Sequence, residues 1–413
     1  MKLSEIATFV EDKISSNSIS LADYVTTDSL LPNKEGKALA TNLPPVICSL
    51  THFRKGDVLV ANIRPYLKKV WLADKEGGCS SDVLVFRVKE GNKSSFLYAI
   101  MLQDRFFDYA MKGAKGSKMP RGDKDQIMRY ELPTFSPQEQ ENIGNLVISI
   151  TNKLWLNRSI NHNLEAMAKQ LYDYWFVQFD FPDENGKPYK SSGGKMVWNE
   201  KLKREIPEDW KVAQLGNICS FRNGINYAKD EIGEPYAIVN VRNISATSIL
   251  LDGEDFDVIT IPLSKATNYI LTEKDIVIAR SGCPGSTRLL HTSNKTLFCG
   301  FIICCTPIEE YLRNYITLFL KILEGSSATT SGGSILQNVS QDTLKSLWII
   351  LPSIKLLMIF DRFLKDLIDL LYSNSMAIKI LTKQRDELLP LLMNGQVKVG
   401  VERSRLNYDL SHD

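Results

Sequence analysis

The sequence predicts an α+β protein with two mixed α/β domains and two long helices. Three observations predict this class: the length, an internal repeat, and two long amphipathic segments that each follow a Leu-Pro pair. The chain has 413 residues, too many for one hydrophobic core, which predicts two or three domains. Its 44% apolar and 24% charged residues are close to globular averages, which excludes disordered, collagen-like and disulfide-scaffold classes.

Four short segments recur in the same order in the two halves of the chain. Residues 2–9 match 214–221, 56–61 match 274–279, 115–117 match 332–334, and 131–133 match 350–352, at offsets between 212 and 219 residues. Each match is short, but their common order and nearly constant offset predict a tandem of two similar halves. Chance similarity between strand patterns is the alternative explanation.

The globular part of each half combines short strands with a helix. Apolar runs at 57–61, 83–88, 275–279 and 297–305 predict strands, and the spacing of apolar residues over 96–111 and 311–323 predicts helices. A loop rich in Gly, Ser or Lys follows each helix, at 112–122 and 325–334. We therefore expect domains at 1–135 and 211–352.

Two long helices are predicted at 136–180 and 353–395. The first begins at Ser136-Pro-Gln-Glu139, a capping box with Pro in the first turn. Apolar residues then recur at heptad spacing, and Asn157 and Asn374 each interrupt the apolar line of their helix. A lone polar residue in a coiled-coil seam commonly fixes register, so we expect these two residues to set the register of the helix pair. An ordinary amphipathic helix packed on a domain is the alternative.

The remaining segments are polar. Residues 181–194 are rich in Pro, Gly and Ser, so 181–210 is predicted to be a hinge and the entry into the second half, and 396–413 a C-terminal tail. At 1.5 Å per residue, each helix of about 40 residues is about 60 Å long.

The chain lacks the sequence signatures of common catalytic and metal sites. It has four histidines, no phosphate-binding glycine motif, and seven cysteines without Cys-x-x-Cys spacing, so we assign no catalytic residue and no metal ligand. The cysteines predict reduced thiols in the cytoplasm. The start of the chain has no apolar signal segment, and no window reaches the ~18 apolar residues of a membrane span.

One weak match to an enzyme motif is present. Pro182-Asp183, followed by Asp209 and Lys211, is similar to the pattern of Mg²⁺-dependent nucleases, which place two carboxylates and a lysine around the metal. A nuclease is therefore the alternative function, although Asp183 lies in the predicted hinge, where a solvated linker is the simpler interpretation.

Basic residues are concentrated in the first half. Residues 1–135 carry 20 basic and 16 acidic residues, and the excess is concentrated between 105 and 129. Lysine and arginine on a glycine-rich loop suit phosphate contact, and arginine can also read guanine edges. The predicted DNA contacts here are Arg64, Lys68, Lys69, Lys112, Lys115, Ser117, Lys118 and Arg121.

The second half offers polar rather than basic candidates. Residues 196–352 carry 15 basic and 17 acidic residues, so the selection depends on Arg, Asn and Gln in glycine-bearing loops, because these side chains make bidentate base contacts. An ordinary solvated surface is the alternative for each. The predicted contacts are Arg222, Asn223, Asn226, Arg280, Ser281, Arg288, Gln337 and Asn338.

This arrangement resembles the specificity (S) subunit of type I restriction–modification systems over essentially the whole chain. The resemblance is carried by Ile206-Pro-Glu-Asp-Trp-Lys211, by Leu215-Gly216 after the hinge, and by the duplicated order of domain and helix. It implies two target-recognition domains that each read half of a split site on double-stranded DNA. The helices would form an antiparallel coiled-coil spacer, and about the pseudo-twofold axis of the repeat Asn157 would approach Asn374.

The resemblance also implies partners and an absence of catalysis in this chain. Two methyltransferase (M) subunits, and restriction (R) subunits in the full complex, would supply the chemistry. S-adenosylmethionine and ATP with Mg²⁺ would bind on those subunits and no cofactor on this one. The outer faces of the helices would bind the methyltransferase, with residues 172–176 as a candidate patch unless they pack on a domain. A coiled-coil scaffold without a DNA role is a third alternative.

Overall fold

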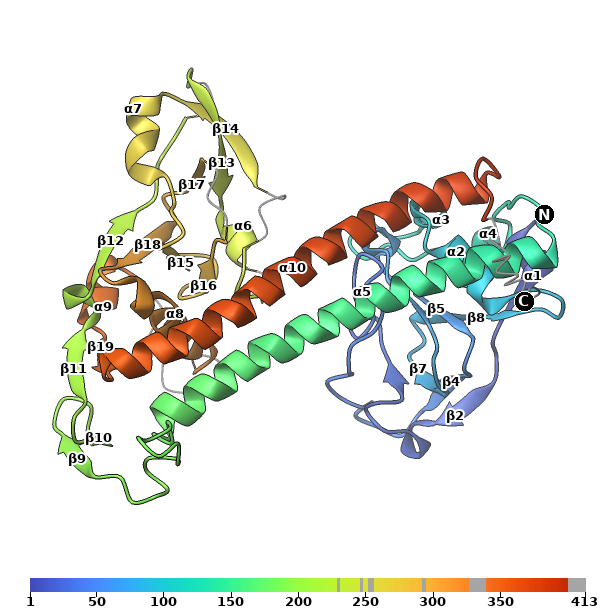
Figure 1. The fold of residues 1–413 in the computed structure, drawn as a ribbon. Coiled ribbons are helices and arrows are strands. Elements are labelled where there is room, and N and C mark those ends of the chain that lie inside the picture. The colour runs from blue at the N-terminus through green and yellow to red at the C-terminus, as the bar shows by residue number, and fades with distance from the viewer. Residues whose placement is uncertain (229–230, 246–247, 252–255, 292–294, 327–338, 400–413) are drawn as a thin grey trace, which may run out of the picture. The chain divides into compact units, whose positions relative to one another are not determined.

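The computed structural model describes residues 1–413 except 229–230, 246–247, 252–255, 292–294, 327–338 and 400–413. The chain divides into two compact units, unit 1 (residues 1–157 and 377–413) and unit 2 (residues 158–376). Two long helices, α5 (Pro137–Tyr172) and α10 (Ile354–Met393), contribute residues to both units (Figure 1). The prediction of a mixed α/β protein with two long helices is therefore confirmed.

Unit 1 contains two four-stranded sheets. One has the order β1-β8-β5-β6 and is antiparallel throughout; the other has the order β2-β4-β7-β3, with β3 parallel to β7. The elements before α5 are α1 (Leu3–Ile6), β1 (Ala7–Phe9), β2 (Lys13–Ser15), η1 (Ser16–Ser18), β3 (Tyr24–Val25), β4 (Ser49–Phe53), β5 (Val58–Ala61), η2 (Pro65–Leu67), β6 (Val70–Leu72), β7 (Gly77–Cys79), β8 (Val83–Val88), α2 (Ser94–Met101), α3 (Asp104–Lys112) and α4 (Lys124–Met128).

The single helix predicted over 96–111 is wrong, because the chain breaks between α2 and α3. Gln103 takes an extended backbone conformation, with ψ 139°, and becomes the N-cap residue of α3. Its buried side chain donates a hydrogen bond to the carbonyl of Ile100, 3.3 Å away. Periodicity could not reveal this break, because both helices bury apolar residues in the same core.

The start of α5 follows from its sequence. Ser136 and Glu139 form the predicted capping box: the Glu139 N–H donates to the Ser136 hydroxyl at 3.3 Å, and the Ser136 N–H donates to the Glu139 carboxylate at 3.0 Å. Gly144 lets α5 approach α2 closely, because a Cβ atom there would lie 2.1 Å from the Ser95 hydroxyl. Ile143 of α5 and Leu389 of α10 belong to the same core as α2.

Unit 2 contains a four-stranded antiparallel sheet of order β12-β18-β15-β16. In this sheet, as in β1-β8-β5-β6 of unit 1, the last strand in the sequence lies between the first and the second. Smaller sheets are β14-β13-β17, β11-β19 and β10-β9. Its elements are η3 (Asp173–Val177, one π turn), β9 (Met196–Asn199), β10 (Arg204–Pro207), β11 (Lys211–Gln214), η4 (Leu215–Asn217), β12 (Cys219–Asn223), β13 (Glu234–Val239), α6 (Val241–Ile244), β14 (Asp257–Ile261), α7 (Leu263–Ala266), η6 (Thr267–Tyr269), β15 (Ile276–Ala279), β16 (Thr287–Leu289), β17 (Thr296–Phe298), β18 (Ile302–Pro307), η7 (Glu310–Leu312), α8 (Arg313–Ser326), α9 (Gln341–Ser346) and β19 (Trp348–Leu351).

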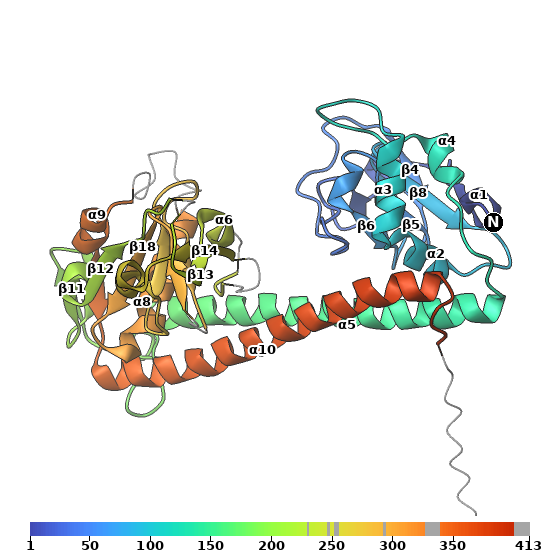
Figure 2. The ribbon, with the colours of Figure 1, turned by 90° about the horizontal axis from the view of Figure 1, so that it is seen from above.

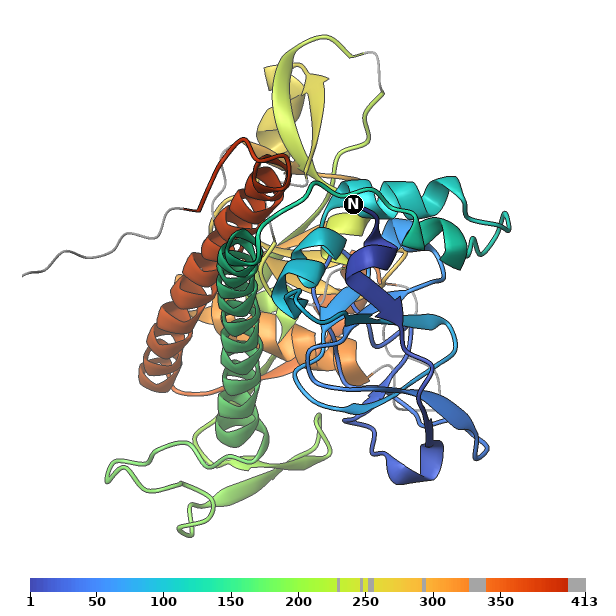
Figure 3. The same ribbon diagram turned by 90° about the vertical axis from the view of Figure 1, so that its right-hand side faces the viewer.

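The segment predicted as a loose hinge folds against unit 2. Phe181 stacks on Tyr189 and on Trp210, with ring centroids 4.7 Å and 4.8 Å apart. Strands β9 and β10 pair as a hairpin, drawn in green beyond the end of α5 in Figure 3. Polar composition predicted a linker, but the aromatic residues at its two ends pack on the core of unit 2 and attach the largely exposed segment to it.

The aromatic run at the end of α5 is also buried. Tyr172, Trp175 and Phe176 belong to the core of unit 2, where Phe176 packs on Phe360 and Tyr315 with centroids 4.7 Å apart in both pairs. The prediction that residues 172–176 form a docking patch is therefore wrong, except for Tyr174, which is exposed. Helix-to-domain packing explains the other residues.

A candidate DNA interface

The basic loop of unit 1 is a short projecting finger, residues 115–121. Lys115 and Arg121 exchange two backbone hydrogen bonds of 2.9 Å, which close the base of the loop. The Arg64 N–H donates to the Pro120 carbonyl at 2.8 Å, so the finger is joined to the loop before η2. In Figure 2 the finger is the teal loop between α3 and α4. These backbone bonds present the basic side chains on one ordered element.

The cations of the finger are exposed. Lys115 is 86% exposed and lies 3.5 Å from Asp123, while Arg121 is 59% exposed and lies 3.1 Å from Asp82. Lys112, Ser117 and Lys118 are also exposed. Surface ion pairs of this kind contribute about 0–1 kcal/mol, so a phosphate can displace them readily. The finger is therefore a suitable surface for the DNA backbone.

The predicted contacts at 64–69 separate into two groups. Arg64 lies beside the finger, half-buried and with its Nε unpartnered in the structure. Lys68 lies 3.0 Å from Asp104, and the Lys69 ammonium donates to the Thr27 carbonyl. The structure thus brings Arg64 to the finger and directs Lys68 and Lys69 into contacts within the protein.

Three loops of unit 2 meet at one edge of its four-stranded sheet. β12 and β15 end at this edge and β18 begins there, because β18 is antiparallel to both. The Gly224 N–H donates to the Ile302 carbonyl at 3.0 Å, and the Arg280 N–H donates to the Phe301 carbonyl at 2.9 Å. Asn223, Asn226 and Arg280 are exposed here and Ser281 is half-buried. The edge therefore gathers neutral hydrogen-bonding groups and one arginine.

Two predicted arginines form ion pairs with carboxylates of the protein itself. The Arg222 guanidinium donates to Asp275 at 2.7 Å and to the carbonyls of Asn268 and Ile270. Arg288 is 1% exposed and lies 3.0 Å from Glu324. Burial alone raises the pKa of Glu324, but the hydrogen bond and charge of Arg288 outweigh it, and the pKa is lowered. Burial argues against Arg288 as a DNA contact, and Gln337 and Asn338 lie outside the described residues.

The helix asparagines fall in different units. Asn157 is 4% exposed and belongs to unit 1, whereas Asn374 belongs to unit 2 and its amide nitrogen has no partner in the structure. Within unit 2, Asn161 of α5 donates to the Ser375 hydroxyl of α10 at 3.1 Å. Sequence reasoning missed Asn161, since it stands off the apolar line. The approach of Asn157 to Asn374 stays a prediction.

An open apolar groove lies between α5 and α10 in unit 2. It has a volume of about 630 Å³ and is lined mainly by Met167, Leu171 and Tyr174 of α5 and by Phe363, Leu367 and Leu370 of α10. Met167 and Phe363 are about half exposed, at 53% and 54%. Sequence reasoning placed a partner surface on the helices but chose the buried aromatic run instead of these residues.

The nuclease pattern is not assembled in this structure. The Asp183 carboxylate accepts hydrogen bonds from the N–H groups of Asn185 and Lys187, both at 2.8 Å, so it caps a turn. Within the described part of the chain, no group of three His, Cys, Asp or Glu residues is arranged to hold a metal ion. In the same residues, no helix combines the length and apolarity needed to cross a bilayer.

Comparisons with known proteins find similarity to type I specificity subunits. Residues 207–374 match the model of the type I restriction modification DNA specificity domain. The chain is 24% identical over 359 residues to the MjaIX specificity subunit of Methanocaldococcus jannaschii, covering 85% of this chain and 80% of that protein. It is 20% identical over 403 residues to the HindI specificity subunit of Haemophilus influenzae, covering 83% and 87% of the two chains.

A solved structure supports the fold. The crystal structure of the type I restriction–modification S subunit from M. genitalium aligns with 95% of each chain at a TM-score of 0.60 and 15% identity. The predicted resemblance is confirmed.

Proposed function

We propose that this chain, a member of the specificity-subunit family of type I restriction–modification systems, selects the DNA sequence on which such a complex acts. The observation that carries the proposal is the specificity domain at 207–374, together with similarity to two specificity subunits over more than four fifths of the chain. The nuclease alternative has no support, because the Asp183 carboxylate is held in a turn.

Each recognition domain would read one half of a split site. In the first domain, Arg64, Lys112 and the finger residues Lys115, Ser117, Lys118 and Arg121 would contact phosphates and base edges. In the second domain, Asn223, Asn226, Arg280 and Ser281 would do so from the sheet edge. Arginine and asparagine make bidentate contacts to guanine and adenine in the major groove, so both surfaces carry suitable donors.

The two long helices would form an antiparallel coiled-coil spacer about a pseudo-twofold axis. The first half of α5 shares a core with the end of α10 in unit 1, as Ile143 and Leu392 show. The second half of α5 shares a core with the start of α10 in unit 2, where Leu164 and Phe360 are buried together. These pairings support opposite directions for the two helices. Their length would then set the number of unread base pairs between the half-sites.

The chemistry would belong to partner subunits. Two methyltransferase subunits would dock along α5 and α10, and the apolar groove around Met167 and Phe363 is a suitable surface because large exposed apolar side chains are typical of protein interfaces. S-adenosylmethionine would bind on the methyltransferase subunits, and ATP with Mg²⁺ on restriction subunits. The complex would be cytoplasmic, where thiols such as those of the seven cysteines stay reduced.

The proposal can be tested by sequencing modified bases. The chain would be co-expressed with its methyltransferase subunit, and methylated adenines in host DNA would be mapped. We expect one bipartite motif that disappears when this chain is omitted. An unchanged methylation pattern in its absence, or no sequence-specific methylation in its presence, would contradict the proposed function.

A further inference from the structure

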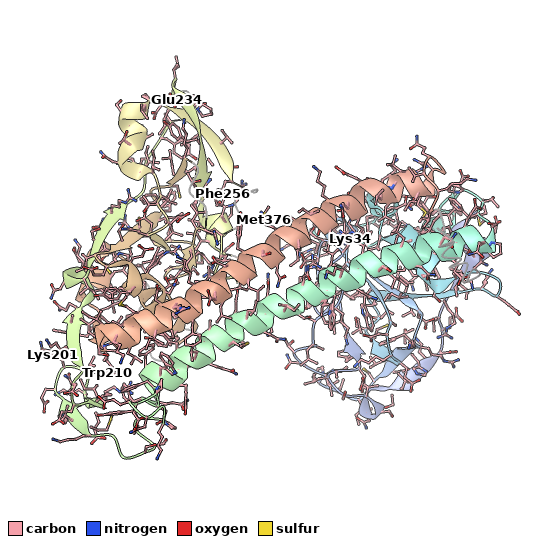
Figure 4. The ribbon with its side chains drawn as sticks, viewed as in Figure 1. Lys34, Lys201, Trp210, Glu234, Phe256 and Met376 are labelled. Atoms are coloured by element: carbon pink, nitrogen blue, oxygen red, sulfur yellow. The ribbon has the colours of Figure 1, made fainter. Side chains whose placement is uncertain are left out.

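A cluster of charges around the buried Lys34 joins the first recognition domain to α10 within unit 1. The Lys34 ammonium lies 2.9 Å from both Asp104 of α3 and Asp386 of α10, and its side chain is only 5% exposed. Lys68 lies 3.0 Å from Asp104, and Arg385 lies 3.0 Å from Asp386. The position of Lys34 is marked in Figure 4. A lysine that is almost fully buried is stable only when paired, so this residue depends on both carboxylates.

The backbone that carries the cluster is strained. Asn33, Lys34 and Lys68 take left-handed conformations with φ between 52° and 64°, which side-chain-bearing residues rarely adopt. Two backbone hydrogen bonds hold the loops together, from Asn33 to Leu67 and from Lys34 to Lys68, both at 2.9 Å. Strained conformations of this kind persist where the surrounding structure enforces them. With these backbone conformations, the side chains of Lys34 and Lys68 both contact Asp104.

The cluster also connects to the DNA-contacting elements. Asp104 lies in the first turn of α3, and the finger leaves the other end of the same short helix. Arg64 directly precedes η2, and Lys68 directly follows it. The two elements proposed to contact DNA are therefore fixed, through Asp104 and Lys68, to the same point as Asp386 of α10.

The ionisation of the carboxylates agrees with this geometry. Burial by itself raises the pKa of Asp386, but the hydrogen bonds and charges of Arg385 and Lys34 outweigh it, so the pKa is lowered. Asp104 behaves in the same way with Lys34 and Lys68. Both carboxylates are therefore charged at neutral pH and attract Lys34.

Unit 2 has a comparable attachment built from one carboxylate and two neutral hydrogen-bond donors. Glu165 of α5 accepts hydrogen bonds from the Ser248 hydroxyl at 2.8 Å and from the Ile249 N–H at 3.1 Å. In each unit, a loop of the recognition domain thus contacts the half of a long helix that comes from the other part of the chain. The attachment in unit 1 involves five charged side chains and is the more dependent on one residue, Lys34.

We propose that Lys34 is a positioning residue that clamps the first recognition domain to the C-terminal half of α10 and thereby sets the spacing between the half-sites. The inference rests on the proposed function. A recognition domain that can shift on its helix would still read its own half-site. It would, however, tolerate spacers that the native complex rejects.

The test uses the complete complex with its methyltransferase subunits. Methylation rates would be measured on DNA with the native spacer and with spacers one base pair longer or shorter. We expect Lys34→Met and Asp386→Asn each to reduce discrimination between these spacers about tenfold, and the double variant to be no worse than Lys34→Met, because the two residues act as one pair. Lys34→Arg, which keeps the charge, should retain most of the discrimination.

Matched controls separate positioning from stability. Arg87→Met removes a partner of Asp12 and of buried Asp57 in the same domain, so it should reduce stability without changing spacer preference. Unchanged discrimination in both Lys34→Met and Asp386→Asn would overturn the proposal, as would an equal loss in Arg87→Met. A wild-type complex without sequence-specific methylation would instead refute the proposed function itself.

Discussion

The four-stranded sheets of the two units share strand order and register but neutralise a buried aspartate differently. Phe86 lies opposite Phe9 and Val58 in unit 1, and Cys305 lies opposite Phe221 and Ile276 in unit 2.

The aspartates immediately precede the central strands of these sheets. Asp57 pairs with Arg87 of β8 at 2.7 Å, whereas Asp275 pairs with Arg222 of β12 at 2.7 Å. Thr306 follows Cys305 in β18, as Arg87 follows Phe86 in β8. The Thr306 hydroxyl donates a hydrogen bond to Asp275.

This difference shows what determines the position of an arginine. A buried carboxylate requires a cation, but either the adjacent strand, as with β8, or the strand beyond it, as with β12, can supply it. Arg222 therefore neutralises Asp275 within the sheet, although its sequence context resembled a base-reading loop. In unit 1 the corresponding requirement is met by Arg87, and the cations of the finger remain exposed. The candidate DNA surface of the first domain is accordingly the more basic one, and that of the second domain is the more neutral one.

The largest expected effect comes from changing the distance between the two units. Insertion of seven residues at matching positions in α5 and α10 preserves a heptad seam and lengthens each helix by about 10 Å. We expect methylation of the native site to fall more than about a hundredfold and a site with a spacer about 3 base pairs longer to be methylated, since base pairs stack ~3.4 Å apart. Altered half-sites in the methylome would contradict the spacer role of the helices.

Removal of the arginines that pair with the buried aspartates would test the equivalence of the two sheets. Arg87→Met and Arg222→Met should each lower the free energy of unfolding by about 3 kcal/mol, because each leaves an uncompensated carboxylate in the interior. Urea titration followed by tryptophan fluorescence measures this change. Lys203→Met, which breaks an exposed pair with Glu200, should have little effect. A neutral Arg222→Met would indicate that Arg222 is free to contact DNA.

The salt dependence of DNA binding would distinguish the two recognition surfaces. A Lys115→Ala, Lys118→Ala, Arg121→Ala variant should bind about 1 kcal/mol more weakly per lost contact and reduce the salt slope by about 1 for each phosphate contact. Asn223→Ala with Asn226→Ala should weaken binding without changing the slope. Fluorescence anisotropy across a salt series measures both quantities. Equal slopes in the two variants would remove the contrast between the domains.

The smallest expected effect concerns the starts of the two long helices. Ser136→Ala removes a reciprocal capping box and should lower the free energy of unfolding by about 1 kcal/mol. Ser353→Ala removes only the bond from the Leu356 N–H, at 3.3 Å, and should have a smaller effect. Thermal unfolding of the single variants compares them directly. A larger loss for Ser353 would show that the reciprocal Glu139 bond contributes nothing.

Local sequence patterns predicted the regular elements well. The strands at 58–61 and 83–88 and the start of α5 follow from apolar runs and a capping box that act over a few residues. The break at Gln103 and the folding of 181–210 could not be predicted, because both depend on contacts with distant residues. The aromatic partners of Phe181 lie as far away as Trp210.

Propensity and periodicity act along the chain, so they were sufficient to predict the two long helices, most strands and the resemblance to type I specificity subunits. Which charged residues are available to a partner depends on how the chain folds. Arg288 and Lys118 are both basic residues in glycine-bearing segments of the sequence, yet Arg288 is buried against Glu324 and Lys118 is exposed on the finger. The physical reason is that the pairing of a charge depends on carboxylates brought near it by folding, as Asp386 is brought to Lys34 across 352 residues.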